Sequence, residues 1–524
     1  MKIYLFAIII LSQFLWGGSG KSNNTLPTIC NPLNLSYRFA LESPSRREAA
    51  DPTVVWFKDR YYLFASKSGG YWHSQDLVEW SLIETNQIPT EEYAPTAITI
   101  EDTLYFLASS NEKSTIYKSA NPLKGKWSVA VEELETPVWD PAFFLDDDER
   151  LYLYWGCSNE NPIYGVEIDY RDNFSFIGEP QELIHANPKQ YGWEVPGDYN
   201  TLTQQNPWIE GAWMNKHKGK YYLQYSGPGT EYKSYADGVY ISNSPLGNFK
   251  CAPHNPFSIK PEGFICGAGH GSTFKDQYGN YWHIATMTIS VKHKFERRLG
   301  LFPTFFDEDG TLYTYTGFGD YPIKIPDYKV DSYHELRTDA MLLSYNKKVT
   351  VSSFQANHPE ELATDENVRT YWSAKTGEPG EWIQIDLGKM YNLHSIQVNF
   401  AEHKPKLFGR DSSIYYQYIV EYSRDKENWK LLIDKKDNMK DGPHDYTELE
   451  KTVDARYIRL SNYRIPSGLF AISGLRIFGK GDYSKPEKNV NLNVERSSSD
   501  RRVLNLRWKK CANAVGYNVK YGID

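Results

Sequence analysis

Short hydrophobic runs rich in aromatic residues recur along the first two thirds of the chain, each after a charged or glycine-containing turn. Another apolar run precedes each turn, so every repeat has the form of a β-hairpin. The second strands of the five hairpins begin at Tyr61, Leu104, Leu151, Tyr221 and Tyr281. Their spacing suits blades of about four strands with loops of variable length. The pattern predicts an all-β chain with a five-bladed β-propeller over residues 45–335.

The pattern changes at the end of this region. Phe305 and Phe306, an acidic turn and an apolar run at 312–316 predict a sixth hairpin that completes or closes the ring. Beyond Tyr333, several runs alternate hydrophobic and polar residues as half-buried strands do. They predict a second β domain, a β-sandwich of the jelly-roll type, over residues 340–480.

The two ends of the chain differ from the domains between them. Lys2, an apolar run to Trp16 and four small residues predict a signal peptide at 1–20, and hence a secreted or periplasmic protein. A leader at 21–44 follows it. No cysteine comes soon after the small residues, which argues against a lipid anchor, and no later run is long enough to span a membrane. After a linker at 481–488, residues 489–524 contain the first strands of a further module, too few to close a core.

Composition narrows the class of partner. The formal net charge is −8 with no basic run, which argues against nucleic acid and anionic membranes as partners. Aromatic residues make up 15% of the chain, and they suit both β-sheet cores and stacking on sugar rings. The five cysteines contain no CxxC pair, which argues against a zinc ribbon, while a Cys251–Cys266 disulfide stays open.

Acidic residues occupy one position of the repeat. Ten or eleven residues before the aromatic strands lie Asp51, Asp140, Glu210 and His270. In a propeller this position begins the innermost strand of each blade, so the four side chains should converge on the axis. A single Asp before Pro is usually a turn or cap residue, but three acids at the same position of one repeat are harder to explain in that way. We therefore expect a catalytic pocket on the axis.

The residues around these positions resemble glycoside hydrolase family 43. The resemblance rests on Ala-Asp-Pro at 50–52, Tyr-Ala-Pro at 93–95, Trp-Asp-Pro at 139–141, Glu-Gly-Ala at 210–212 and Gly-His-Gly-Ser at 269–272. It implies that Asp51 is the general base, that Glu210 is the general acid, and that Asp140 orients the acid and tunes its proton affinity. Tyr93 and Ala212 depart from the usual Trp and Pro of the family pattern.

The same resemblance implies an activity and further site residues. The expected enzyme is an inverting, exo-acting and monomeric glycoside hydrolase that removes arabinofuranosyl (or xylosyl) residues from plant polysaccharides. The alternatives are a β-xylosidase, a galactan-directed exo-hydrolase, a retaining fructosidase and a non-catalytic carbohydrate-binding protein. Trp72, Trp139, His270 and Arg298 are candidates for substrate contact. The chemistry needs no cofactor, but His270 is also a candidate metal ligand, and a structural Ca²⁺ is considered in the propeller axis or the sandwich.

The regions beyond the propeller carry resemblances of their own. Residues 340–480 resemble a discoidin-like, coagulation factor type C domain, also known as a family 32 carbohydrate-binding module, and the tail resembles a fibronectin type III module. On this basis residues 21–335 should suffice for hydrolysis of small substrates, and the sandwich should mainly affect polymer binding.

Overall fold

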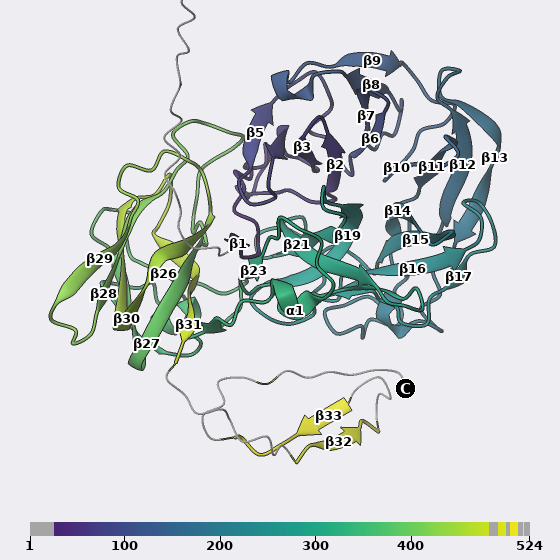
Figure 1. Cartoon of the computed structure of the whole chain (residues 1–524). Coiled ribbons are helices and arrows are strands. Elements are labelled where there is room, and N and C mark those ends of the chain that lie inside the picture. The colour runs from purple at the N-terminus through teal and green to yellow at the C-terminus, as the bar shows by residue number, and fades with distance from the viewer. Residues whose placement is uncertain (1–25, 482–490, 499–503, 512–516, 518–524) are drawn as a thin grey trace, which may run out of the picture.

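The computed structural model describes residues 26–481, 491–498, 504–511 and 517. The predicted signal peptide and nearly all of the predicted linker lie outside these residues. Figure 1 shows a ring of small sheets, the propeller, with a sandwich of longer strands beside it and a separate two-stranded hairpin below. Within the described residues, α1 (Tyr333–Leu336) is the one α-helix, and three 3₁₀ turns are η1 (Pro122–Lys124), η2 (Gly192–Glu194) and η3 (Glu360–Ala363).

Five antiparallel sheets form the blades, each built from strands that follow one another in sequence. Blade one comprises β2 (Thr53–Phe57), β3 (Arg60–Phe64), β4 (Gly70–Ser74) and β5 (Ser81–Glu84). Blade two comprises β6 (Thr96–Ile100), β7 (Thr103–Leu107), β8 (Ile116–Ser119) and β9 (Ser128–Val131). Blade three comprises β10 (Ala142–Leu145), β11 (Leu151–Trp155), β12 (Ile163–Asp169) and β13 (Ser175–Ile184).

The last two blades are built in the same way. Blade four comprises β14 (Glu210–His217), β15 (Lys220–Gly227), β16 (Ala236–Ser242) and β17 (Lys250–Cys251), with β18 (Ser258–Ile259) also paired to β16. Blade five comprises β19 (Cys266–Lys275), β20 (Tyr281–Thr288), β21 (Arg297–Phe306) and β22 (Leu312–Thr314). The five-bladed prediction is confirmed. The expected sixth hairpin is instead β21 with β22, the outer half of blade five.

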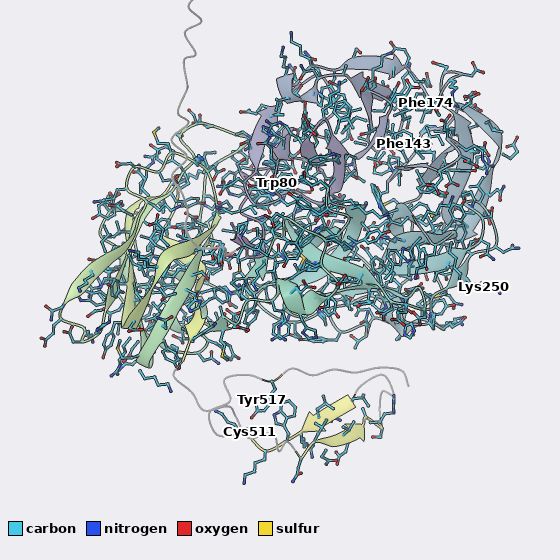
Figure 2. The ribbon with its side chains drawn as sticks, in the orientation of Figure 1. Trp80, Phe143, Phe174, Lys250, Cys511 and Tyr517 are labelled. Atoms are coloured by element: carbon cyan, nitrogen blue, oxygen red, sulfur yellow. The ribbon has the colours of Figure 1, made fainter. Side chains whose placement is uncertain are left out.

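Apolar side chains fill the spaces between neighbouring blades. Phe143 on β10 and Phe174 before β13 meet with ring centroids 6.3 Å apart, in a cluster that also holds Leu107 from blade two (Figure 2). The alternation of strand side chains explains this arrangement, because one face of each twisted sheet is directed at the next blade. The aromatic residues of the repeat therefore serve mainly as core.

The leader closes the ring at blade five. β1 (Thr28–Ile29) pairs with β23 (Ile323–Lys324), which lies beyond the last blade. The Asn31 side chain accepts the N–H of Leu301 at 3.0 Å and donates to its carbonyl at 2.9 Å, both on β21. Residues of the leader thus belong to the same core as blades one and five.

The second domain is a β-sandwich built on two long strands. Its strands are β24 (Met341–Leu342), β25 (Lys348–Val351), β26 (Trp372–Ser373), β27 (Trp382–Phe400), β28 (Gln417–Ser423), β29 (Trp429–Asp434), β30 (His444–Arg464) and β31 (Ala471–Lys480). Register shifts interrupt the pairing of β27 with β30, and such irregularities bend the strands that contain them. Trp372 is fully buried in this core, against the edge of Phe470.

Buried polar contacts join the sandwich to the propeller. Arg47, just before blade one, forms an ion pair with Asp441 at 2.6 Å and another with Glu402. Arg298 on β21 donates to His444 at 3.0 Å. The two domains therefore share an interface of buried charged groups.

The tail contains β32 (Asn493–Arg496) and β33 (Leu504–Arg507), which pair with each other. The rest of the predicted fibronectin-like module lies mostly outside the described residues. In the part of the chain that the structure covers, we find no helix with the length and hydropathy needed to cross a membrane.

Candidate active site

Each blade begins with a sharp backbone turn at the axis. Asp51 (φ 54°), Ala94 (44°) and Asp140 (50°) lie two residues before the innermost strand, Gly211 (63°) and His270 (41°) lie within it, and all five adopt the left-handed region. That conformation is uncommon for residues other than glycine and is concentrated at functional sites. Its recurrence at the same point of five blades marks the axial mouth of the propeller as the candidate site.

Hydroxyl groups join neighbouring blades directly beside these turns. Four backbone N–H groups donate to a hydroxyl that ends the second strand of the preceding blade: Ala94 to Ser66 (2.7 Å), Asp140 to Ser109 (2.9 Å), His270 to Ser226 (2.7 Å) and Asp51 to Thr286 (2.8 Å). Blade three has Gly156 at the matching position. There the neighbouring Cys157 thiol instead donates to a carboxylate oxygen of Glu210, at 3.4 Å.

The structure brings the three predicted carboxylates together around His270. Nδ1 of His270 lies 3.3 Å from Oδ1 of Asp51 and 3.6 Å from Oδ2 of Asp140. Ligand atoms of Asp140, Cys157 and Glu210 lie within 4.8 Å of one another. Burial lowers the pKa of His270, but the carboxylates of Asp51 and Asp140 raise it above its ordinary value. A positively charged imidazolium is therefore favoured between the two aspartates.

Asp51 is held in its ionised form. Its side chain is buried, and Ser66 donates to Oδ2 at 2.5 Å while Nη1 of Arg297 lies 3.3 Å from Oδ1. Burial alone would raise the pKa of Asp51, but Arg297 and His270 lower it below its ordinary value. An ionised carboxylate can accept a proton from water, as a general base must.

Asp140 has the opposite tendency. Burial raises its pKa to about 7; His270 opposes the rise, and the carboxylates of Glu210 and Asp51 add to it. Two carboxyl groups this close do not both ionise readily, so Asp140 retains its proton near neutral pH beside Glu210. On the other side of Glu210, the Tyr235 hydroxyl donates to Oε1. The site thus combines one ionised carboxylate with one carboxyl group that holds its proton.

The structure separates the two arginines at the start of β21. Successive side chains of a strand point to opposite faces, so Arg297 reaches Asp51 whereas Arg298 points to the sandwich and bonds His444. Arg297 also donates to Glu48 at 3.0 Å and to Thr230 at 3.2 Å. The predicted substrate contact of Arg298 is therefore wrong, and Arg297 occupies the place expected for it.

The predicted tryptophans also differ in position. Trp72 is only 1% exposed, in the core shared by the leader and blades one and five, so a sugar cannot reach it and the predicted contact is wrong. Trp139 directly precedes Asp140, is half-buried and donates to Asn111 at 3.1 Å. Trp139 thus stays a candidate for sugar contact.

The axial groups suit Ca²⁺ poorly. The described group able to hold an ion consists of Asp140, Cys157 and Glu210, and it supplies two carboxylates and a thiol. Ca²⁺ takes six to eight oxygen ligands, and thiols are soft. His270, the metal ligand considered from the sequence, is not a member of that group, and its Nδ1 lies between Asp51 and Asp140. Elsewhere, Cys251 and Cys266 are both free thiols, so they form no disulfide.

Comparisons with known proteins match both domains. The sequence model described as glycosyl hydrolases family 43 matches residues 45–312, and the one described as F5/8 type C domain matches residues 348–466. A xylosidase/arabinosidase of Butyrivibrio fibrisolvens is 24% identical over 268 residues, 47% of this chain and 50% of that protein. A β-D-galactofuranosidase of Aspergillus niger is 26% identical over 275 residues (44% and 72%), and a putative β-xylosidase of Escherichia coli is 25% identical over 272 residues (45% and 47%).

Solved structures with a related shape are more distant in sequence. A glycoside hydrolase is 18% identical with a TM-score of 0.49, covering 85% of this chain and 100% of that one. A thermostable family-43 glycoside hydrolase is 22% identical with a TM-score of 0.47, covering 57% and 99%. The match spans about half the length of the Butyrivibrio fibrisolvens and Escherichia coli relatives.

Proposed function

Because this chain belongs to glycosyl hydrolases family 43, we propose that it hydrolyses glycosidic bonds with inversion of configuration at the anomeric carbon. The observation that supports this best is the placement of an ionised Asp51, a proton-retaining Asp140 and Glu210 together at the propeller axis. Inverting hydrolysis needs one carboxylate to activate water and one carboxylic acid to protonate the departing oxygen. The axial site offers carboxyl groups for both tasks.

Each residue then has a separate task. Asp51 takes a proton from the attacking water, and Arg297 and Ser66 keep it ionised and fixed in position. Glu210 gives a proton to the leaving oxygen, while Tyr235 and Cys157 hold its two oxygens. Two negative charges on Asp140 and Glu210 would repel each other, so a proton is retained between these two carboxyl groups. Glu210 transfers this proton to the leaving oxygen. His270 lies between the two aspartates and limits their mutual repulsion.

For the substrate we propose a terminal arabinofuranosyl residue of a plant polysaccharide, with a β-xylosidase as the alternative. Two of the relatives are named for these sugars, as a xylosidase/arabinosidase and a putative β-xylosidase. A galactan-directed exo-hydrolase is a more distant alternative. A non-catalytic sugar-binding protein is disfavoured, since a binding site gains nothing from a retained proton beside an ionised base.

A panel of aryl glycosides tests the proposal. The full chain is assayed on nitrophenyl α-L-arabinofuranoside, β-D-xyloside, β-D-galactoside and β-D-galactofuranoside, with NMR of the first sugar released. We expect fastest turnover of the arabinofuranoside and first formation of the inverted anomer. Retention of configuration, or activity on none of the four, would overturn the proposal.

A further inference from the structure

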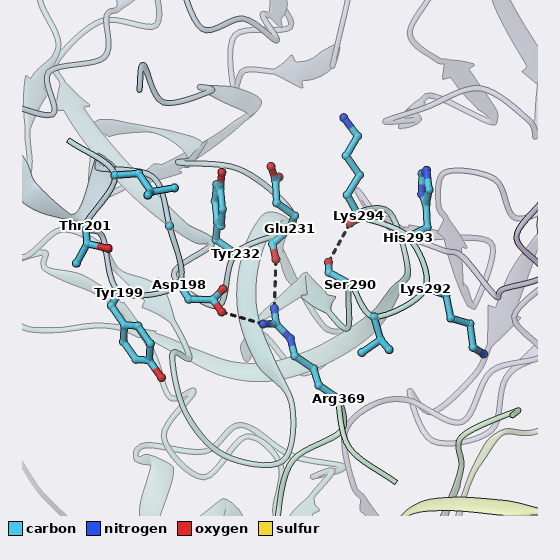
Figure 3. Close-up of a pocket in the computed structure, with 13 residues that line it drawn as sticks. Asp198, Tyr199, Thr201, Glu231, Tyr232, Ser290, Lys292, His293, Lys294 and Arg369 are labelled. Atoms are coloured by element: carbon cyan, nitrogen blue, oxygen red, sulfur yellow. Dashed lines mark hydrogen bonds and ion pairs between the residues drawn. The ribbon is translucent and has the colours of Figure 1, made fainter. Parts of the chain in front are cut away.

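A pocket of about 520 Å³ lies where the propeller meets the sandwich (Figure 3). We call it the junction pocket. Three loops of the propeller line it, at 197–202, 231–232 and 290–294, together with Arg369 from the sandwich. These loops follow β13, β15 and β20. The loops after β15 and β20 lie at the axial mouth of the propeller, where the catalytic groups lie.

The junction pocket shares a wall with the candidate active site. In the loop between β15 and β16, Thr230 accepts a hydrogen bond from Arg297, and Tyr235 donates to Glu210. Glu231 and Tyr232 stand between these two residues and line the pocket. A few residues of chain therefore contact the catalytic groups on one side and the pocket on the other.

The second wall leads to the same groups. The N–H of Ser290 donates to the carbonyl of Glu296 at 3.1 Å, which closes the loop just before Arg297. The Ser290 hydroxyl in turn donates to the carbonyl of Lys294 at 2.9 Å, one of the contacts drawn in Figure 3. This loop is therefore compact, and it ends at the arginine that bonds Asp51.

Arg369 connects the sandwich to both remaining loops. Its guanidinium donates to the carboxylate of Asp198 at 2.9 Å and to the backbone carbonyl of Glu231 at 3.2 Å (Figure 3). The planar fork of arginine fits two acceptors at once, which a lysine could not match. The neighbouring Val368 is anchored by a backbone hydrogen bond to Phe264 in the propeller, at 2.8 Å. The sandwich thus supplies part of the pocket and holds its loops in place.

The lining suits a sugar chain. Tyr199 is 67% exposed, and Tyr232 offers a second ring, so apolar faces are available for stacking. Such rings bind well where one face is apolar and polar groups are near. The charged lining residues are Lys292, Lys294 and Arg369 against Asp198 and Glu231. This near balance of charge favours an uncharged glycan over a strongly anionic ligand.

We propose that the junction pocket binds the sugar residues on the leaving-group side of the scissile bond. This inference rests on the proposed function, since it extends the same substrate. It assigns the sandwich a direct part in the substrate site of the propeller, through Arg369, rather than a separate site on its own loops. A terminal sugar in the axial pocket would place the following sugars along the shared wall.

The test compares a long and a short leaving group. Tyr199→Ala and Arg369→Ala are assayed on an arabinoxylan oligosaccharide and on nitrophenyl α-L-arabinofuranoside (xylohexaose and the nitrophenyl xyloside, should the xyloside be preferred). For Tyr199→Ala we expect KM for the oligosaccharide to rise about tenfold, which is the loss of one stacking contact. The change on the nitrophenyl substrate should be several times smaller. Tyr345→Ala, an exposed tyrosine of the sandwich outside the pocket, is the control and should change neither value.

The outcomes are separable. If the wild type hydrolyses the nitrophenyl glycoside but Tyr199→Ala affects both substrates equally or neither, the inference is wrong and the proposed function stands. If the wild type hydrolyses neither substrate, the proposed function fails and the inference fails with it. Arg369→Ala gives a second test, because loss of its contact with Asp198 should also raise KM for the oligosaccharide selectively. Arg424 is an exposed arginine elsewhere on the sandwich, and Arg424→Ala should leave this KM unchanged.

Discussion

The axis of the propeller and its interface with the sandwich both bury charged side chains, but they balance the charges differently. At the interface, Arg47 is paired with both Glu402 and Asp441 and also donates to a backbone carbonyl. Burial raises the pKa of Glu402, but Arg47 and Lys292 lower it below its ordinary value. On the axis, by contrast, burial and the neighbouring carboxylates raise the pKa of Asp140 to about 7.

Buried charges therefore have different roles in the two regions: they dock the domains at the interface and serve acid–base chemistry on the axis. Glu402, which has several cations around it, stays ionised and helps to fix one geometry of the two domains, although burial raises the pKa of its neighbour Asp441. A buried carboxylate with too few cations holds its proton, which an acid catalyst requires and which costs stability.

The ion pairs at the interface also change an expectation from the sequence. Removal of the sandwich would take away the partners of Arg47 and Arg298, so we now expect residues 21–335 alone to be less stable than the full chain.

The largest expected effect is on the axis. Glu210→Gln should slow cleavage of an oligosaccharide by ~10²–10⁴-fold, because the leaving oxygen then departs without a proton. It should slow a dinitrophenyl glycoside far less, since that leaving group needs no proton. Asp51→Asn should slow both substrates alike, because both need the activated water. Steady-state kinetics of the two variants on the two substrates measures this. If Asp51→Asn spares the dinitrophenyl substrate and Glu210→Gln does not, the roles are interchanged.

Substitutions at the interface should lower the stability of the protein rather than its catalytic rate. Arg47→Met removes the cation that Glu402 and Asp441 share in the buried interface, which should lower the free energy of unfolding by ~3–5 kcal/mol. Denaturant unfolding of the full chain measures it, with kcat of the folded variant as the second reading. Arg424→Ala, whose pair with Asp454 is exposed, is the control and should cost less than ~1 kcal/mol. Equal losses for the two variants would mean that the interface charges do not stabilise the docking.

The pH profile should report the retained proton. Activity of the wild type should fall as the pH rises through about 7, where Asp140 loses its proton. Asp140→Asn removes the second negative charge, so the descending limb should move to lower pH by ~1 unit. The measurement is kcat/KM against pH. Asp148→Asn, an exposed residue of the same blade, should leave the limb in place, and an unmoved limb in Asp140→Asn would contradict the role of Asp140.

The smallest expected effect concerns Cys157. A hydroxyl donates a stronger hydrogen bond than a thiol, so Cys157→Ser should favour the ionised Glu210 and lower kcat ~2–10-fold on an oligosaccharide. The descending limb should again move to lower pH. Cys157→Ala, which removes the donor, should not move it in that direction. A limb at lower pH in both variants would show that the thiol acts through packing alone.

The sequence predicted the fold and the central carboxylates because both follow from the repeat. Asp51, Asp140 and His270 share one position of the blade, and propeller symmetry brings that position to the axis. Cys157 and Tyr235 occupy other positions and were missed. A signal did exist for Cys157, since the hydroxyl that ends the second strand of four blades is replaced in blade three by Gly156.

Other residues could not be placed without the structure. Arg297 and Arg298 are neighbours on one strand, and only the register decides which of them faces the axis. Trp72 is one of many aromatic residues in similar strands, so burial in the core could not be distinguished from exposure to a sugar. The junction pocket depends on how two domains dock, and no local pattern around Arg369 indicates that contact.

Unfolding of Asp140→Asn and Glu402→Gln across pH 4 to 8 tests the contrast between the two regions most directly. Because the pKa of Asp140 is raised in the native state, its contribution to stability declines as the pH rises from about 4 to about 7. Asp140→Asn should therefore gain stability relative to the wild type over that range. The pKa of Glu402 is lowered, so its contribution is present above its ordinary pKa, and Glu402→Gln should be less stable than the wild type at pH 8. Opposite signs at pH 8 are the predicted result, and a loss of stability in both variants would contradict it.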